Sequence, residues 1–140
     1  MGLFRKKKKR QPKEETGSFD INTGNDFEHL LAMYFEAVGA NKVKVTPPTN
    51  DGGKDIIFYL DKKKHIVECK RFLNGGIGRP MIQQFHSAII DERADAGMFV
   101  TTSYFTREAQ IYAAKHGILL WNRKTLVKEL KKVGIDLTFT

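Results

Sequence analysis

The sequence has one cysteine, one tryptophan and no long apolar run. Because Cys69 is the only cysteine, no disulfide can form within the chain. We expect no cleavable signal sequence before the domain, and no apolar stretch approaches the roughly 20 residues that a membrane-spanning helix needs. We therefore expect a soluble protein with no transmembrane segment, in a reducing, cytoplasmic setting.

The length of 140 residues allows one hydrophobic core and leaves no room for a second. Hydrophobic residues make up 41% of the chain and charged residues 29%, close to the averages for soluble domains. No internal repeat is visible. The composition therefore predicts one globular unit.

Positive charge is concentrated at the start of the chain. The formal net charge is +8, and residues 1–18 carry seven Lys or Arg against two Glu. Because like charges repel and cannot form a core, we expect residues 1–18 to be a disordered basic arm and residues 19–140 to be the folded domain. Three roles of the arm stay open: non-specific phosphate binding, contact with an anionic membrane surface, or a solubilising tail.

The clearest predicted helix follows this arm. Its apolar residues recur with the i, i+3, i+4 and i+7 spacing of one buried helical face, and Gly39 suits its C-terminal end. Asn25 and Glu28 have the spacing of a capping box, in which each side chain satisfies a backbone amide of the first turn. The residues of the apolar face are Phe27, Leu30, Leu31, Tyr34, Phe35 and Val38.

After this helix, short β-branched and aromatic runs alternate with amphipathic segments. We expect strands at residues 43–45, 56–60, 65–70, 98–102 and 118–121. We expect further helices at residues 80–91, 106–117 and 124–132, the first opened by Pro80 and the second capped by Thr106. The order α-β-β-β-α-β-α-β-α predicts an α/β fold with a mixed sheet that helices cover.

The second and third predicted strands form a hairpin if the polar residues 61–64 are its loop. This loop length places Asp55 opposite Lys70. Side chains alternate between the faces of a strand, so Asp55, Glu68 and Lys70 share one face, while Cys69 points to the other. Opposite Cβ atoms are about 4.5 to 5.5 Å apart, so two carboxylates and an ammonium group form one cluster. A slip of one residue would scatter them over both faces.

Two carboxylates beside an ammonium group suit metal-assisted hydrolysis of phosphodiesters. Mg²⁺ prefers oxygen ligands, polarises a phosphoryl oxygen and lowers the pKa of bound water. Asp55 and Glu68 can supply such oxygens, and the backbone carbonyl of Cys69 can add another. Lys70 can orient the attacking water or neutralise charge on phosphorus. By spacing alone, an Asp that faces a Lys is more often a structural ion pair, and that alternative stays open.

Several short motifs surround this cluster. They are Asn25-Asp26-Phe27-Glu28, Asp51-Gly52-Gly53-Lys54-Asp55, Val67-Glu68-Cys69-Lys70-Arg71-Phe72, Phe99-Val100-Thr101-Thr102-Ser103, Phe105-Thr106-Arg107-Glu108-Ala109 and Gly117-Ile118. In this order they resemble the Mrr-type restriction endonuclease domain, a branch of the PD-(D/E)xK nuclease superfamily. The resemblance covers residues 23–130.

The resemblance implies a restriction-endonuclease-like αβββαβ core, with a mixed central sheet flanked by helices, that cleaves DNA with Mg²⁺ or Mn²⁺. It assigns metal binding to Asp55 and Glu68 and assistance of the nucleophilic water to Lys70. Glu28 would be the family's helix-borne acid, although capping alone would also explain it. Many members carry Gln at the position of Glu68, and Lys54 stands where the superfamily's name has proline.

Candidate DNA contacts flank these motifs. Lys54 and Arg71 adjoin the cluster, while Arg79 and Gln84 belong to the helix that follows it. Cations and amides at such places neutralise or bind phosphates beside a scissile bond. The four histidines lack the spacing of metal ligands and are expected to be non-catalytic, and Trp121 is expected in the core.

The function that the sequence predicts is a metal-dependent DNA endonuclease, acting in restriction of foreign or modified DNA or in DNA repair. DNA is the expected partner. A homodimer is also expected, because double-strand cleavage generally needs two active sites. The alternatives are a catalytically inactive DNA-binding module of the same fold, a branched-DNA (Holliday junction) resolvase, and a protein-interaction subunit.

Overall fold

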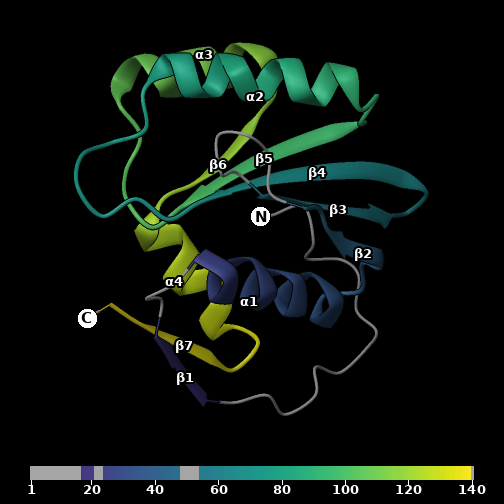
Figure 1. The fold of residues 1–140 in the computed structure, drawn as a ribbon, viewed down its shortest axis with the longest axis vertical. Helices are drawn as coiled ribbons and strands as arrows, with labels where there is room; N and C mark the ends of the chain where they lie inside the picture. Colours follow the sequence, from purple (N-terminus) through teal and green to yellow (C-terminus); the bar gives the residue numbers. More distant parts are fainter. Residues whose placement is uncertain (1–16, 21–23, 48–53, 140) are drawn as a thin grey trace.

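A five-stranded mixed sheet forms the centre of the fold, with the strand order β2-β3-β4-β5-β6 (Figure 1). Its strands are β2 (Asn41–Val45), β3 (Lys54–Leu60), β4 (Lys63–Lys70), β5 (Ala96–Thr101) and β6 (Leu119–Trp121). The first three are antiparallel neighbours, whereas β4, β5 and β6 are parallel. The mixed sheet predicted from the sequence is confirmed.

The structure, a computed structural model, describes residues 17–20, 24–47 and 54–139, with side chains for residues 27–47 and 55–139. Residues 1–16 of the expected arm and Asp51, Gly52 and Gly53 of the expected active-site loop lie outside this part. The side chain of Lys54 lies outside it as well.

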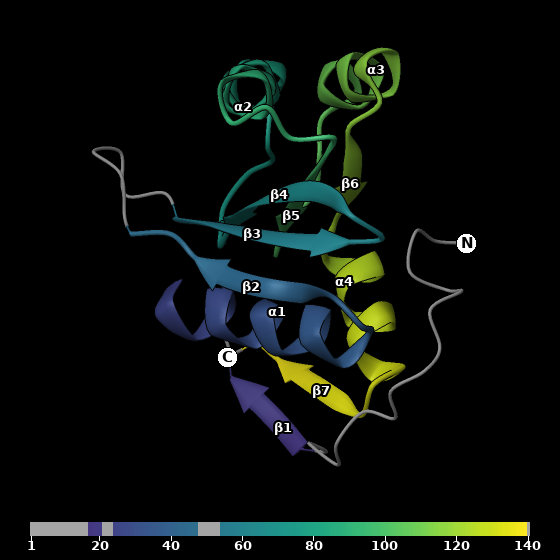
Figure 2. The same ribbon diagram turned by 90° about the vertical axis from the view of Figure 1, so that its right-hand side faces the viewer.

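Helices cover both faces of the sheet. The helices α2 (Arg79–Asp91) and α3 (Arg107–His116) pack on one face, and α1 (Gly24–Ala37) and α4 (Arg123–Lys131) lie on the other (Figure 2). Within the described residues, no helix has the length and apolar character needed to cross a membrane.

The helix α1 confirms the predicted apolar face. Its residues Phe27, Leu31 and Phe35 are fully buried against the sheet, and each such side chain stabilises the fold by about 1.5 to 3 kcal/mol. The helix begins at Gly24, one residue before Asn25. The side chain of Asn25, and with it the predicted capping box, lies outside the described residues. Helix boundaries depend on backbone hydrogen bonding that side-chain spacing does not fix.

The ends of the other helices agree with the sequence. Thr106 caps α3, where its hydroxyl accepts a hydrogen bond of 3.2 Å from the amide of Ala109. Gly117 ends the same helix with a φ of 69°, a left-handed conformation that glycine adopts without strain. Pro80 lies in the first turn of α2, where its missing amide hydrogen costs no helical hydrogen bond.

Two short strands were not predicted. Gly17–Asp20 forms β1 and Ile135–Thr138 forms β7, and the two pair in parallel as a separate small sheet (Figure 2). Four residues give too short an alternation for prediction, and the pairing joins opposite ends of the chain. Gly17 and Ser18, which we placed in the arm, therefore lie in a strand.

The hairpin between β3 and β4 has a shorter loop than expected. Leu60 pairs with Lys63, so only Asp61 and Lys62 form the turn. Both have positive φ values, 54° and 68°. Two positive φ values are the signature of the type I′ turn, whose twist matches that of the strands it joins.

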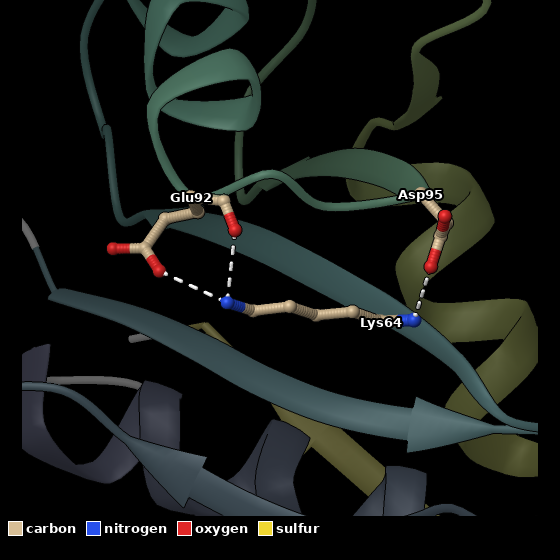
Figure 3. A network of polar contacts seen from close by, with 3 residues as sticks. All are labelled: Lys64, Glu92 and Asp95. Atoms are coloured by element: carbon tan, nitrogen blue, oxygen red, sulfur yellow. Dashed lines mark hydrogen bonds and ion pairs between the residues drawn. The ribbon is translucent and has the colours of Figure 1, made fainter.

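Polar contacts also tie the start of β4 to the turn after α2. The ammonium group of Lys64 donates to the backbone carbonyl of Glu92 at 2.9 Å and to its carboxylate at 3.2 Å (Figure 3). The amide of Lys64 donates to the carboxylate of Asp95 at 2.9 Å. These contacts lie at the end of β4 opposite to Lys70.

Candidate active site

Two carboxylates face each other across the central hairpin. Asp55 on β3 lies directly opposite Glu68 on β4. Their neighbours Ile56, Val67 and Cys69 are buried in the core beneath α1. Because side chains alternate along a strand, Asp55 and Glu68 project from the other face of the sheet, the one that α2 and α3 cover.

The observed strand register differs from the predicted one, but the three predicted side chains still share one face of the sheet. Asp55 was expected opposite Lys70, but the two-residue turn shifts the pairing by two residues, so Glu68 takes that place. A shift of two preserves the alternation, and Asp55, Glu68 and Lys70 still share one face. The carboxylates are therefore closer together than predicted, and Lys70 is a diagonal neighbour of Asp55.

The backbone at Asp55 is fixed from the neighbouring strand. Its amide donates to the hydroxyl of Thr46 at 3.0 Å, and its carbonyl accepts from the amide of Thr46 at 2.8 Å. The backbone bond extends the pairing of β2 with β3 one residue beyond Val45, and the side chain of Thr46 supplies the second bond. A fixed backbone limits the positions that the half-buried carboxylate of Asp55 can reach.

A third carboxylate approaches the same strand from the other layer. Glu28 on α1 is only 6% exposed. Burial raises the pKa of the Cys69 thiol, and the negative charges of Glu28, Glu68 and Asp55 raise it further. The charges of all three carboxylates thus reach Cys69. The thiol itself is buried in the core, as predicted.

Two threonines that the sequence analysis assigned no role bind the backbone at the end of β4, one at Lys70 and one at Phe72. The hydroxyl of Thr101 donates to the carbonyl of Lys70 at 2.9 Å. The hydroxyl of Thr102 accepts from the amide of Phe72 at 2.9 Å and donates to its carbonyl at 3.2 Å. Both threonines are fully buried. Two consecutive threonines at the end of an apolar strand were the available signal, because a buried hydroxyl needs a partner.

The residues expected to contact DNA lie at the start of β3, just after β4 and on α2. Arg71 is half-buried beside Lys70, while Arg79 and Gln84 are exposed on α2. The guanidinium carbon of Arg79 lies 5.5 Å from the centre of the Tyr112 ring. Lys54 begins β3.

The donor set fits a hard divalent cation. Mg²⁺ is usually held by one or two carboxylates together with water and substrate phosphates, so Asp55 and Glu68 suffice as side-chain ligands. The described residues contain no group of three or more His, Cys, Asp or Glu side chains arranged to hold a metal ion. A site of two carboxylates therefore agrees better with the geometry than a closed cage of protein ligands.

A cavity of about 650 Å³ lies elsewhere, between α1, α4 and the other end of the sheet. Its lining includes the core residue Trp121, which is 6% exposed as predicted. The hydroxyl of Tyr34 donates to Glu129 at 3.4 Å inside it, and burial together with this carboxylate raises the pKa of Tyr34. Asp55, Glu68 and Lys70 do not line this cavity.

Structural comparison finds the same fold in other solved structures. The chain matches the DNA modification-dependent restriction endonuclease AspBHI with a TM-score of 0.62 and 24% identity, over 77% of this chain and 31% of that one. It also matches the protein of unknown function AF1548 with a TM-score of 0.59 and 18% identity, over 72% of this chain and 63% of that one. At these identities the likeness concerns the fold.

Sequence comparison finds a curated relative in Escherichia coli strain K12, the type IV methyl-directed restriction enzyme EcoKMrr. The two are 40% identical over 94 residues, which are 63% of this chain and 31% of the enzyme. The chain thus spans less than a third of the length of that relative.

A family model decides the classification. The restriction endonuclease family Mrr_cat matches residues 19–130, which include Glu28, Asp55, Glu68 and Lys70. This range agrees with the resemblance that the motifs indicated. The chain therefore belongs to the Mrr_cat restriction endonuclease family.

Proposed function

We propose that this chain is a metal-dependent endonuclease that hydrolyses phosphodiester bonds in DNA. The observation that carries the proposal is the placement of Asp55 directly opposite Glu68, with Lys70 two residues further along the same face of β4. Membership of the Mrr_cat family supports it.

Asp55 and Glu68 would hold the divalent cation, Mg²⁺ or Mn²⁺, together with the backbone carbonyl of Cys69. When bound, such a cation polarises a phosphoryl oxygen and makes water a better nucleophile. Glu28 would add negative charge from the α1 side of the sheet, near Cys69. Carboxylates that face each other repel, so a cation between them would also relieve that repulsion.

Lys70 would act on the reacting atoms. Its ammonium group can donate hydrogen bonds to the attacking water and to a non-bridging phosphate oxygen, which places the water and neutralises charge as it grows on phosphorus. The new bond would join the water oxygen to phosphorus, and the bond from phosphorus to the leaving oxygen of the sugar would break. The attacking water would lose a proton to solvent, and the leaving oxygen would take one up. Thr101 fixes the carbonyl of Lys70 and so holds the base of this side chain.

The proposed substrate is modified DNA. EcoKMrr is by name methyl-directed, and AspBHI is by name modification-dependent. Arg71, Arg79, Gln84 and Lys54 would bind phosphates beside the cut, and the arm formed by residues 1–16 would add non-specific affinity. We also propose a homodimer, since two copies would present two sites to the two strands.

The experiment is a cleavage assay with Mg²⁺ or Mn²⁺ on methylated duplex, unmethylated duplex, supercoiled plasmid and four-way-junction DNA. We expect metal-dependent cleavage by the wild type and its loss in Lys70→Ala, with DNA binding retained. The matched control is Lys63→Ala, which removes an exposed lysine at the other end of β4 and should leave cleavage unchanged.

Each outcome of this assay is informative. Preferential cleavage of methylated duplex supports the modification-directed role, and preferential cleavage of the junction favours the resolvase instead. DNA binding without metal-dependent cleavage of any substrate would overturn the proposal in favour of an inactive DNA-binding module.

A further inference from the structure

Two large apolar side chains are exposed in the loops that follow β4 and β5. Leu73 follows β4 and Tyr104 follows β5, and each is 56% exposed. We call these two residues the apolar rim. The carboxyl ends of the parallel strands β4 and β5 lie at the same edge of the sheet (Figure 1). Lys70 is the last residue of β4, so both loops start at its end of the strand.

Hydrogen bonds fix the loops that carry the apolar rim to each other. The amide of Ile77 donates to the carbonyl of Tyr104 at 2.8 Å, and the amide of Thr106 donates to the carbonyl of Ile77 at 3.0 Å. The hydroxyl of Ser103 donates to the carbonyl of Gly75. The exposed side chains are thus presented by a fixed backbone, not by a loop free to fold them inward.

The ring of Tyr104 packs closely on a residue that has no side chain. Gly76 lies against it, and a Cβ atom at that position would overlap three atoms of the ring. This close approach leaves one part of the ring packed on backbone and the rest open to solvent. A rigid, half-open aromatic ring gives contact area at little cost in conformational entropy.

The two loops that carry the apolar rim contain no acidic side chain, although Glu108 lies in the first turn of α3. Arg71 precedes Leu73 in the first loop, and Arg79 and Arg107 begin the helices that follow the two loops. Residues 71–78 and 102–106 contain no Asp or Glu. The amino ends of α2 and α3 add the partial positive charge of their exposed amides. Arginine side chains bind the phosphates of nucleic acid, and an aromatic ring stacks on its bases. The combination therefore suits a nucleic-acid ligand.

We propose that the apolar rim contacts the sugar and base surface of DNA next to the scissile phosphate, with the Tyr104 ring against a base or sugar. The inference rests on the proposed function and adds to it a residue that fixes where DNA lies relative to Lys70. The phosphates on either side lie against Arg71 and Arg79, and the rim excludes water between them.

The first test is affinity for a fluorescein-labelled duplex, measured in EDTA so that no cleavage occurs. Loss of one aromatic stacking contact should weaken binding by roughly tenfold in Tyr104→Ala. Tyr104→Phe keeps the ring and should bind as the wild type does. Ile111→Ala and Ile90→Ala are the matched controls, because these residues are 59% and 63% exposed on α3 and α2.

The second test separates DNA contact from a merely structural role. Duplexes that carry 5-iododeoxyuridine beside the cleavage position are irradiated with bound protein, and the adduct is mapped by mass spectrometry. We expect it on the tryptic peptide of residues 94–107, which contains Tyr104, and expect it to disappear in Tyr104→Ala.

An adduct elsewhere, with wild-type affinity in Tyr104→Ala, would overturn the inference. A change of oligomeric state in Tyr104→Ala, without loss of DNA affinity, would equally overturn it and assign the rim to contact between copies. In both cases a wild type that still cleaves DNA leaves the proposed function standing. If the wild type neither binds nor cleaves DNA, the proposed function itself is wrong.

Discussion

The hydroxyl of Thr101 donates a hydrogen bond to the carbonyl of Lys70 and accepts one from the amide of Ser103, at 2.9 Å and 3.2 Å. One buried hydroxyl thus joins the end of β4 to the loop after β5. The link places the candidate catalytic lysine relative to the apolar rim.

Thr101→Val should therefore destabilise the fold, because the partly buried carbonyl of Lys70 and amide of Ser103 each lose a hydrogen-bond partner. We expect the free energy of unfolding in urea to fall by about 1 to 3 kcal/mol. Thr101→Ser keeps the hydroxyl and should recover most of that loss. Equal unfolding midpoints for the valine variant and the wild type would show that the hydrogen bond contributes nothing.

Divalent cations should stabilise the folded protein through Asp55 and Glu68. A ligand that binds only the folded state raises its stability with concentration, so Mg²⁺ should raise the Tm of the wild type. In Asp55→Asn and Glu68→Gln this increase should be much smaller. Asp136→Asn, at an exposed position on β7, is the control and should respond as the wild type does. The same increase in all four proteins would argue against a metal site between the two strands.

Stability should decrease in mild acid because of His65. Burial lowers the pKa of this histidine from its ordinary value of 6.5, against smaller opposing contributions from Asp95 and Asp61. Below pH 6.5 the unfolded chain therefore binds more protons than the folded one, so stability is full above that pH and is lost as the pH falls.

The variant that tests this is His65→Phe, since the imidazole stacks on Phe58 with ring centres 4.8 Å apart. A phenyl ring keeps that stacking and cannot be protonated. We expect the unfolding free energy of the variant to fall less between neutral and mildly acidic pH than that of the wild type. Parallel curves would assign the acid sensitivity to other groups.

The hairpin turn offers a stabilising substitution. Lys62 has a φ of 68°, a left-handed conformation that costs a residue with a side chain about 1 to 2 kcal/mol. Lys62→Gly should raise the free energy of unfolding by roughly 0.5 kcal/mol after the entropy cost of glycine is subtracted. Lys63→Gly, inside β4, should lower it. A loss of stability in Lys62→Gly would contradict the type I′ assignment.

The sequence by itself determined the order of the central elements and the face on which the chemistry lies. Apolar spacing located α1, and turn residues located the ends of α2 and α3. Alternation along β3 and β4 put Asp55, Glu68 and Lys70 on one face. That prediction is correct although the predicted pairing of β3 with β4 was wrong by two residues, because side-chain direction repeats every second residue.

Only the tertiary structure decided which residue faces which. The opposition of Asp55 and Glu68 depends on a turn whose positive φ values no periodicity reveals. The pairing of β1 with β7 and the bond from Thr101 to Lys70 join segments distant along the chain. The local sequence pattern predicts the direction in which a side chain points, whereas the packing of the whole domain decides which residue that side chain contacts.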